Sequence, residues 1–352
     1  MPWLVSRLLV GIGALVALIA SDRLVSDRPV PLDQALLAWD GAGYRDIAAH
    51  GYHSLPPSGL RFFPLFPIAG RLAAFGSARF AGAGLVIVAN IAALVAMVLV
   101  YRLARREFGE RVASVVPWVV ALYPASFVLV LGYSESLLLV TSLSCFLALR
   151  QKRWWWAALA GVLAALCRPL GVLLVLPALI EAARDWRSAG RRELVGRLAA
   201  VVAPAVGLSA FLIYARSVAG EWFTPLRAQE TFRGDLVEPV TRLGQAVGDL
   251  FSSERLGDGL HAPFAIGLVI LTVLALRRLP LSYAAYSAAL VVLSISAENL
   301  NSLERYGLNA FPLLMVAAMV ANRLRLTQAM LTASAGLLVA LTTLAYLGAY
   351  VP

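Results

Sequence analysis

The most informative residues of the chain are ionisable side chains at the ends of apolar segments. Asp40 follows Trp39 after the first apolar segment, and Glu135 lies at the start of a later one. Arg168 and Arg305 lie at two further boundaries. A carboxylate can take a proton from a hydroxyl group as a general base, and a guanidinium fork is well suited to phosphate. These residue types are therefore suited to chemistry on a substrate that carries a phosphate.

Each of these residues also has a purely structural interpretation, which the sequence leaves open. Asp40 is of a type that caps helix N-termini, and Glu135 would complement the dipole of a helix that begins there. Arg168 and Arg305 could extend toward water from a membrane boundary, and Trp39 could anchor the chain at the membrane interface.

Composition places these residues in a membrane protein. The chain has 352 residues, 60% of them apolar and only 14% charged. Apolar runs long enough to cross a bilayer recur along its whole length. We therefore expect an all-α polytopic protein that forms one membrane domain over residues 1–352. About eleven spans are predicted, at 4–24, 82–101, 112–131, 134–149, 154–167, 170–183, 197–218, 260–276, 280–296, 308–322 and 327–347.

The distribution of charge predicts the orientation. With the N-terminus in the cytoplasm, starting with Arg7, the inner segments hold 17 of the 30 basic residues but 5 of the 20 acidic ones. The segment 154–156, three tryptophans, fits an aromatic belt on this side. The 29 arginines against one lysine indicate a GC-rich, bacterial genome, so we expect the bacterial cytoplasmic membrane.

Two long loops then face outward, at 25–81 and 219–259. The first has apolar residues at helical spacing over 41–50 and 65–75, which predicts short helices lying on the membrane surface. Four polar clusters fall on this same side: Trp39-Asp40, 133–136, 168–171 and 304–306. Their agreement predicts one extracytoplasmic site, in which Glu304 is a possible partner of Arg305.

Several function classes are disfavoured. The net charge of +10 lies in short clusters between spans, so it does not indicate nucleic acid. The chain lacks a Gly-rich phosphate loop, a dinucleotide fingerprint and an Asp-x-Asp pair. Few Cys and His residues are available, so no metal or other cofactor is expected. Cys145 and Cys167 are predicted to be packed thiols, and His50 and His53 to be surface residues.

The outer motifs resemble the GPI mannosyltransferase 2 (PIG-V) family in its shorter bacterial form. The resemblance rests on residues 39–52 with Phe62-Phe63-Pro64-x-x-Pro67, on Asn90, on 124–127 with 132–137, on Arg168-x-x-Gly171, and more loosely on Arg305-Tyr306 with Pro312. The chain departs from the family at 53–57, where the family usually has a Glu, and at Pro169-Leu170, where it has Ser-Asn.

The resemblance implies a GT-C glycosyltransferase that takes mannose from a polyprenyl-phosphate carrier on the extracytoplasmic face. Its acceptor would be a lipid or a glycan, and its partners would otherwise be membrane lipids. It implies that Asp40 is the catalytic base. The residues expected to bind substrate are Trp39, Tyr44, Tyr133, Glu135, Arg168, Arg305 and Tyr306.

Two other functions fit the same pattern. A transporter or flippase of a lipid-linked sugar would also be polytopic and basic on its inner side. It would usually place ionisable groups near the middle of its spans, whereas here they lie at the outer ends. A subunit that binds glycolipids without catalysis is the second alternative, because the first-loop Glu of the family is replaced.

Overall fold

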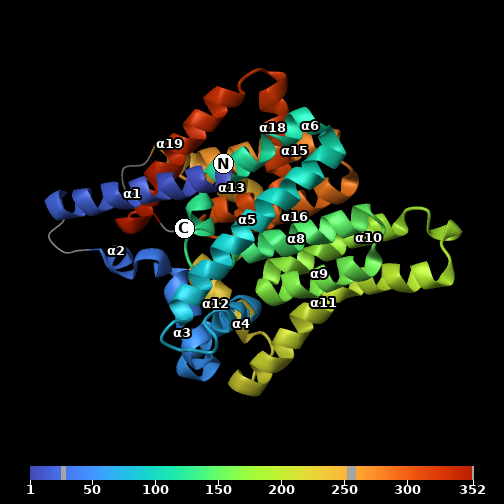
Figure 1. Cartoon of the computed structure of the whole chain (residues 1–352), viewed down its shortest axis with the longest axis horizontal. Helices are drawn as coiled ribbons and strands as arrows, with labels where there is room; N and C mark the ends of the chain where they lie inside the picture. Colours follow the sequence, from blue (N-terminus) through green and yellow to red (C-terminus); the bar gives the residue numbers. More distant parts are fainter. Residues whose placement is uncertain (25–28, 252–258, 351–352) are drawn as a thin grey trace.

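The structure, a computed structural model, describes residues 1–24, 29–251 and 259–350, and these residues form a bundle of helices (Figure 1). The prediction of an all-α protein is confirmed, with a single-residue bridge between Leu236 and Ala297 as the only β-type pairing in these ranges. The helices that build the bundle are α1 (Pro2–Leu24), α5 (Ala81–Phe108), α7 (Val116–Leu122), α8 (Glu135–Arg150), α9 (Trp154–Cys167), α10 (Val175–Ala183), α11 (Arg191–Ala219), α15 (Ala262–Arg278), α16 (Leu281–Ile295), α18 (Phe311–Arg323) and α19 (Thr327–Tyr346).

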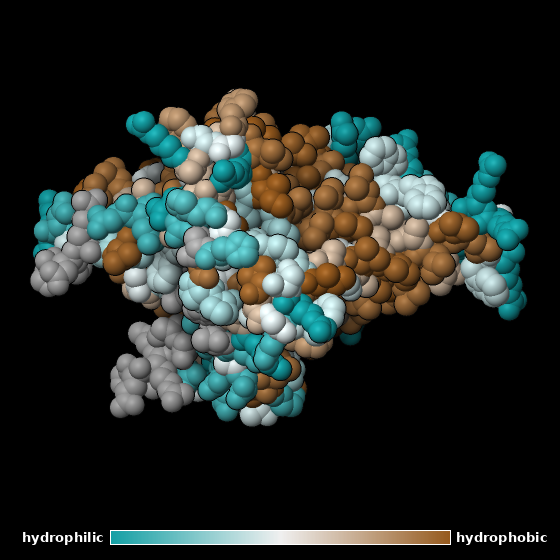
Figure 2. Space-filling model, turned by 90° about the horizontal axis from the view of Figure 1, so that it is seen from below, coloured by the Kyte–Doolittle hydropathy of each residue, from teal (hydrophilic) through white to brown (hydrophobic). Residues whose placement is uncertain are grey.

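The apolar surface agrees with a membrane protein. Among the described residues, α1, α5, α11 and α19 are long and apolar enough to cross a bilayer, and four shorter apolar helices accompany them. Figure 2 shows a broad hydrophobic surface between hydrophilic regions at its two ends. The number of eleven spans stays a prediction.

Three predicted spans differ from the structure, each at a proline. Residues 112–131 are not one helix: α6 (Glu110–Ala113), α7 and the 3-10 turn η4 (Ser126–Leu129) follow one another, and Tyr123 is extended before Pro124. The span at 170–183 begins as a 3-10 helix, η5 (Pro169–Leu174), before α10. The predicted start at 308 is replaced by a break before α18, whose first turn contains Pro312.

The two loops that are predicted to face outward, here called the outer loops, contain short helices. The expected helices of the first loop are confirmed as α3 (Asp40–His50) and α4 (Leu65–Ala73), which are preceded by α2 (Val30–Gln34). The second loop, for which no helix was expected, forms α12 (Thr224–Arg233) and α13 (Pro239–Asp249). Glu238 caps α13 by accepting from the backbone N–H groups of Val240 and Thr241, and Pro239 occupies its first turn.

A small apolar core holds α3 and α4 against α5. Tyr44 and Ile47 of α3 pack with Phe66 of α4. A Cβ atom on Gly84 would lie 2.1 Å from the carbonyl oxygen of Gly70, so the close crossing of α4 and α5 requires glycine at position 84. The first outer loop is therefore fixed to the bundle, and α3 holds one orientation.

Arg7 belongs to the predicted first span, 4–24, and has partners inside the bundle. Arg7 lies within α1, where its Nε donates to Asn90 Oδ1 at 3.0 Å and its Nη2 to the carbonyl of Leu129 at 2.9 Å. Asn90 is a polar residue in the apolar helix α5, so it needs a partner within the protein. The Arg7 guanidinium supplies that partner.

Candidate functional site

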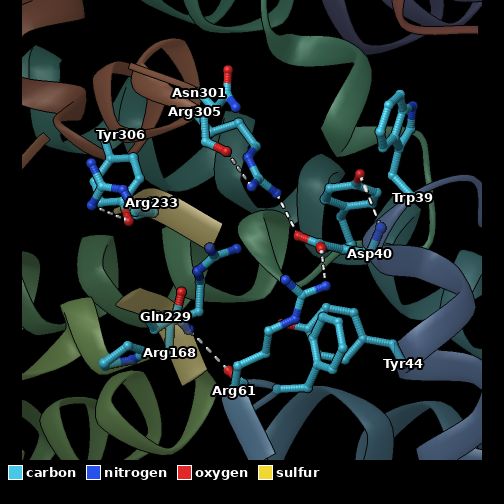
Figure 3. A pocket seen from close by; sticks show the side chains of 14 residues that line it. Trp39, Asp40, Tyr44, Arg61, Arg168, Gln229, Arg233, Asn301, Arg305 and Tyr306 are labelled. Carbon is cyan, nitrogen blue, oxygen red and sulfur yellow. Dashed lines mark hydrogen bonds and ion pairs between the residues drawn. The ribbon is translucent and has the colours of Figure 1, made fainter. Parts of the chain in front are cut away.

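A polar pocket lies where the two outer loops meet the ends of the bundle helices (Figure 3). Its volume is about 340 Å3. Four arginines and one aspartate contribute charge, and aromatic side chains form much of the remaining wall. The lining residues are Trp39, Asp40, Tyr44, Arg61, Phe62, Tyr133, Arg168, Pro169, Gln229, Arg233, Asn301, Ser302, Arg305 and Tyr306.

Asp40 lies at one side of this pocket with two guanidinium groups directed at it (Figure 3). Arg305 Nη1 donates to Oδ2 at 2.8 Å, and Arg61 Nη2 donates to Oδ1 at 3.4 Å. The interpretation of Asp40 as a helix N-cap is wrong. Asp40 is the first residue of α3, and its carboxylate accepts from these arginines instead of from backbone N–H groups.

The backbone before Asp40 is strained, and hydrogen bonds hold it. Trp39 has a backbone φ of 58°, a value that residues other than glycine rarely adopt. Its backbone N–H donates to Gln34 Oε1 at 3.1 Å, and its indole Nε1 donates to the carbonyl of Ala345 at 3.0 Å. Such strain costs on the order of 1–3 kcal/mol and clusters at functional sites. Here it turns the Asp40 side chain into the pocket.

A second carboxylate lies behind the pocket wall. Glu135 begins α8 and is fully buried, and Arg168, just after α9, donates to its Oε1. Arg305 Nη1 also lies 3.4 Å from Glu135 Oε1, so Arg305 bridges the two carboxylates. Glu135 is the first residue of α8, where its charge complements the helix dipole as expected, and it is also paired with arginine. Arg168 and Arg305 face the pocket and do not extend away from the protein.

Two of the three tyrosines of the predicted site, Tyr44 and Tyr133, connect α3 with the turn before α8. Tyr44 and Ser134 share a hydrogen bond of 2.8 Å between their hydroxyl oxygens. The backbone N–H of Asp40 donates to the hydroxyl of Tyr133 at 3.3 Å, and the Arg305 guanidinium lies 5.4 Å from the centre of the Tyr133 ring. All eight residues predicted for the site line the pocket or support its wall, while their roles stay predictions.

Two pocket arginines were not anticipated from the sequence. Arg61 is the last residue of the 3-10 helix η3 (Pro57–Arg61), and Arg233 is the last residue of α12. Arg233 Nη1 donates to the Tyr306 hydroxyl at 2.8 Å, and its guanidinium lies over the Tyr306 ring at 4.5 Å. Arg61 directly precedes the Phe62-Phe63-Pro64 motif, which was a usable signal, whereas no motif surrounds Arg233.

Glu304 is not the partner of Arg305, and that expectation is wrong. The side chain of Glu304 points away from the pocket and is fully buried. It accepts from Tyr350 at 2.7 Å and lies 2.9 Å from the Nδ1 of the buried His261. Successive residues on the short helix α17 (Leu303–Asn309) project in different directions, which explains why neighbours in sequence have different partners.

Two expectations about residues outside the pocket are confirmed. His50 and His53 are exposed, and Cys145 and Cys167 are buried free thiols. No group of three or more possible metal ligands occurs within residues 1–24, 29–251 and 259–350. The carboxylate that lines the pocket, Asp40, and Glu135 behind the wall are both paired with arginine.

The charge of Asp40 has a consequence for stability. Burial alone would raise the pKa of Asp40, but Arg305 and Arg61 outweigh it and hold the pKa below the ordinary value of 3.8. A lowered pKa means that the ion pairs stabilise the folded state above the ordinary pKa, and that this contribution is lost as the pH falls through the lowered pKa.

We therefore expect the wild-type protein to be more thermostable in detergent than Asp40→Asn by a margin that is constant at neutral and mildly acidic pH. The margin should shrink only below pH 3.8. Thermal unfolding of both proteins across this range measures it. A margin that already shrinks between about pH 7 and about pH 5 would contradict the assigned ion pairs.

Comparison with known proteins identifies the fold. No protein-family model matches the chain, and no curated protein matches it, so the resemblance to the PIG-V family stays a prediction. Among solved structures, ArnT from Cupriavidus metallidurans, bound to undecaprenyl phosphate, aligns with a TM-score of 0.53 and 18% identity. The alignment covers 90% of this chain and 59% of ArnT.

The oligosaccharyltransferase of Archaeoglobus fulgidus, in complex with Zn and sulfate, aligns with a TM-score of 0.50 and 16% identity. The alignment covers 95% of this chain and 53% of that one. The chain thus spans a little over half the length of both neighbours, which are GT-C glycosyltransferases. It has the GT-C fold of membrane glycosyltransferases.

Proposed function

We propose that the chain transfers a sugar from a polyprenyl-phosphate carrier to a lipid or glycan acceptor, with mannose as the sugar. The observation that carries this proposal is the pocket itself, where four arginines and a single aspartate line one cavity. A cationic pocket of this kind suits an anionic phosphate, and the carboxylate beside it suits a hydroxyl acceptor. The GT-C fold supports this reaction class by analogy.

In the proposed reaction, Asp40 is the general base. It takes a proton from the acceptor hydroxyl, whose oxygen forms a bond to the anomeric carbon of the sugar. The bond between that carbon and the carrier phosphate oxygen breaks on the opposite face, and the phosphate leaves with the electron pair. A β-linked donor would therefore give an α-linked product. Arg61, the more distant of the two arginines at 3.4 Å, is the partner that an acceptor hydroxyl would displace.

The arginines supply the electrostatic part of this scheme. The leaving phosphate carries its own negative charge, so it needs nearby cations more than a strong acid. Arg168 and Arg233 line the pocket (Figure 3), form no hydrogen bond to Asp40, and are our candidates for contacts to the phosphate. Arg305 keeps Asp40 in place and adds positive charge.

An apolar groove next to the pocket would hold the hydrocarbon chain of the carrier. Its volume is about 320 Å3, and it lies between η5, α11, α12 and α16. Its lining includes Leu170, Leu173 and Leu208. Pro169, Gln229, Arg233 and Tyr306 belong to both the groove and the pocket. A carrier that lies in the groove would thus place its phosphate at Arg233 and its sugar toward Asp40.

Replacing Arg233 with glutamine should weaken binding of undecaprenyl phosphate by about 10- to 100-fold, since a hydrogen bond to a charged group contributes about 1.5–3 kcal/mol. Binding of the radiolabelled lipid to purified protein in detergent measures this. Arg227→Gln on the same helix is the matched control, because Arg227 is exposed and pairs with Glu221. Equal losses in both variants would contradict a phosphate site at Arg233.

The scheme uses no metal ion. The carboxylates that could hold a metal ion are already paired with arginines, and the positive charge of the pocket would repel a metal cation. We expect sugar transfer to continue in the presence of a chelator at a rate close to normal. Loss of activity that added Mg2+ or Mn2+ restores would refute this part of the scheme.

We further propose that this is a multi-pass protein of a bacterial cytoplasmic membrane, with a cytoplasmic N-terminus and the pocket on the extracytoplasmic face. The strong excess of basic residues in the loops predicted to face the cytoplasm supports this orientation. Single cysteines that replace exposed residues test this orientation in intact cells. A cysteine at position 53 should react with a thiol reagent that cannot cross the membrane, and a cysteine at position 277 should not.

The donor sugar is tested by incubating the purified protein with a membrane lipid extract and polyprenyl phosphates that carry radiolabelled mannose, glucose or another sugar. Mannose should move to a new lipid or glycan faster than the others. Faster transfer of another sugar would correct the donor while leaving the enzyme class intact. Movement of intact labelled lipid across vesicles without bond formation would favour a flippase instead.

A further inference from the structure

A second charged groove lies at the end of α9 that is distant from the polar pocket. It has a volume of about 560 Å3 and lies between the first turns of α9 and α11. We call it the basic tryptophan groove. Its lining consists of Lys152, Arg153, the tryptophans 154–156, Arg192, Glu193 and Gly196. α9 has 14 residues and ends next to Arg168, so about 20 Å of helix separates the groove from the pocket.

The charges of this groove are unbalanced. Lys152, Arg153 and Arg192 are exposed, and none of them forms an ion pair with another described residue. The carboxylate in the lining, Glu193, is already held by Arg197, whose Nη2 lies 2.7 Å from Glu193 Oε1. Three cations therefore face the same hollow, while the carboxylate that lines it, Glu193, interacts electrostatically with Lys152 but is shared with Arg197. This arrangement is complementary to an anionic group.

The groove is also held in shape. The backbone N–H of Arg153 donates to the carbonyl of Ala148 at 2.8 Å, and Lys152 adopts φ 56°, so the turn between α8 and α9 is fixed. The buried guanidinium of Arg197 lies 5.1 Å from the centre of the Trp154 ring and donates to the carbonyl of Ala182 at 2.7 Å. The cationic side chains thus start from a defined backbone.

An apolar strip leads away from the cations along the bundle. Trp155 and Trp156 are 63% and 64% exposed, amounts unusual for tryptophan unless it contacts a membrane. One turn further along α9, Leu159 is 49% exposed, and on α11 Leu194 and Leu198 are 40% and 64% exposed. A free phosphate ion would use the cations alone, whereas a lipid would use both the cations and the strip.

We propose that the basic tryptophan groove binds the headgroup of an anionic phospholipid, with the acyl chains along the strip on α9 and α11. Basic pockets between the ends of membrane helices recognise anionic headgroups in this way. Arg192 and Arg153 contact the phosphate, and the indole rings of Trp155 and Trp156 lie at the level of the glycerol backbone. This site does not depend on the sugar-transfer reaction, because it lies at the other end of α9.

The test is the binding of phosphatidylglycerol to the purified full chain in a neutral detergent, measured by native mass spectrometry. The triple variant Lys152→Gln, Arg153→Gln and Arg192→Gln should bind it on the order of 100-fold more weakly, since each exposed cation contributes about fivefold. The pair Arg277→Gln and Arg278→Gln is the control, because it removes two exposed cations from another loop without tryptophans. This control should bind as the wild type does.

Three further measurements complete the test. Phosphatidylcholine should bind the wild type and the triple variant equally. Glycerol phosphate should compete only weakly, and competition as strong as that of the lipid would overturn the assignment to a lipid. An unchanged affinity of the triple variant, or an equal loss in the control pair, would overturn the site itself. Arg192→Gln alone, which should lose several-fold affinity, serves if the triple variant does not fold.

Discussion

Sugar transfer by the Asp40→Asn variant should be slower than wild-type transfer by at least ~10²–10⁴-fold, the contribution of a positioned general base. The amide of asparagine matches the carboxylate in size and can still accept a hydrogen bond from Arg305, but it cannot take a proton. The loss should appear in kcat, while the affinity for undecaprenyl phosphate stays close to normal. Single-turnover transfer and lipid binding, measured on the same preparation, separate these two quantities.

Asp46→Asn is the matched control for this variant. Asp46 lies on the same helix, is 38% exposed and pairs with its neighbour Arg45 outside the pocket. Its removal should leave the rate of transfer within about twofold of the wild type. If Asp40→Asn folds and turns over at a rate close to that of Asp46→Asn, Asp40 has no part in the mechanism.

Replacing Arg305 with methionine should destabilise the protein by about 3–5 kcal/mol, the usual cost of removing one partner from a buried ion pair. Arg305 is 9% exposed, and its loss leaves Asp40 with only the contact to Arg61 at 3.4 Å. It also removes one of the two guanidinium groups near Glu135, whose Oε2 has no hydrogen-bond partner among the described residues. Thermal unfolding in detergent measures the effect.

Two further variants test whether this loss comes from the unpaired carboxylates. Arg61→Met removes a longer and more exposed contact to Asp40, so it should cost clearly less than Arg305→Met. Adding Asp40→Asn to Arg305→Met should recover part of the stability, because the charge left without its partner is then gone. An Arg305→Met protein as stable as the wild type, or one that Asp40→Asn destabilises further, would disprove the ion-pair account.

The helices of the first outer loop and the residues of the site could be predicted from the sequence because they depend on local sequence patterns. Helical spacing over 41–50 predicts α3, and the change from apolar to polar residues marks the ends of α8 and α9, where Glu135 and Arg168 lie. The charge asymmetry placed these ends on the same side. Their convergence on one pocket is therefore a consequence of topology.

The features that were missed depend on long-range contacts. Whether Asp40 caps α3 or faces Arg305 depends on where residue 305 lies in space, and 265 residues separate the two in sequence. Arg233 lines the pocket because α12 folds back over it. The polar sequence of this loop does not predict that contact. The pairing of Glu304 with His261 follows from the direction in which α17 projects its side chains.

The proposed function requires a group transfer that starts from a lipid-linked sugar in the polar pocket. The most direct test incubates purified wild-type protein with polyprenyl-phosphate-mannose, labelled in the sugar, and a membrane lipid extract. We predict a labelled α-linked product together with one equivalent of free polyprenyl phosphate for each sugar transferred. A donor that binds but stays intact with every extract and every sugar tested would contradict the proposed function.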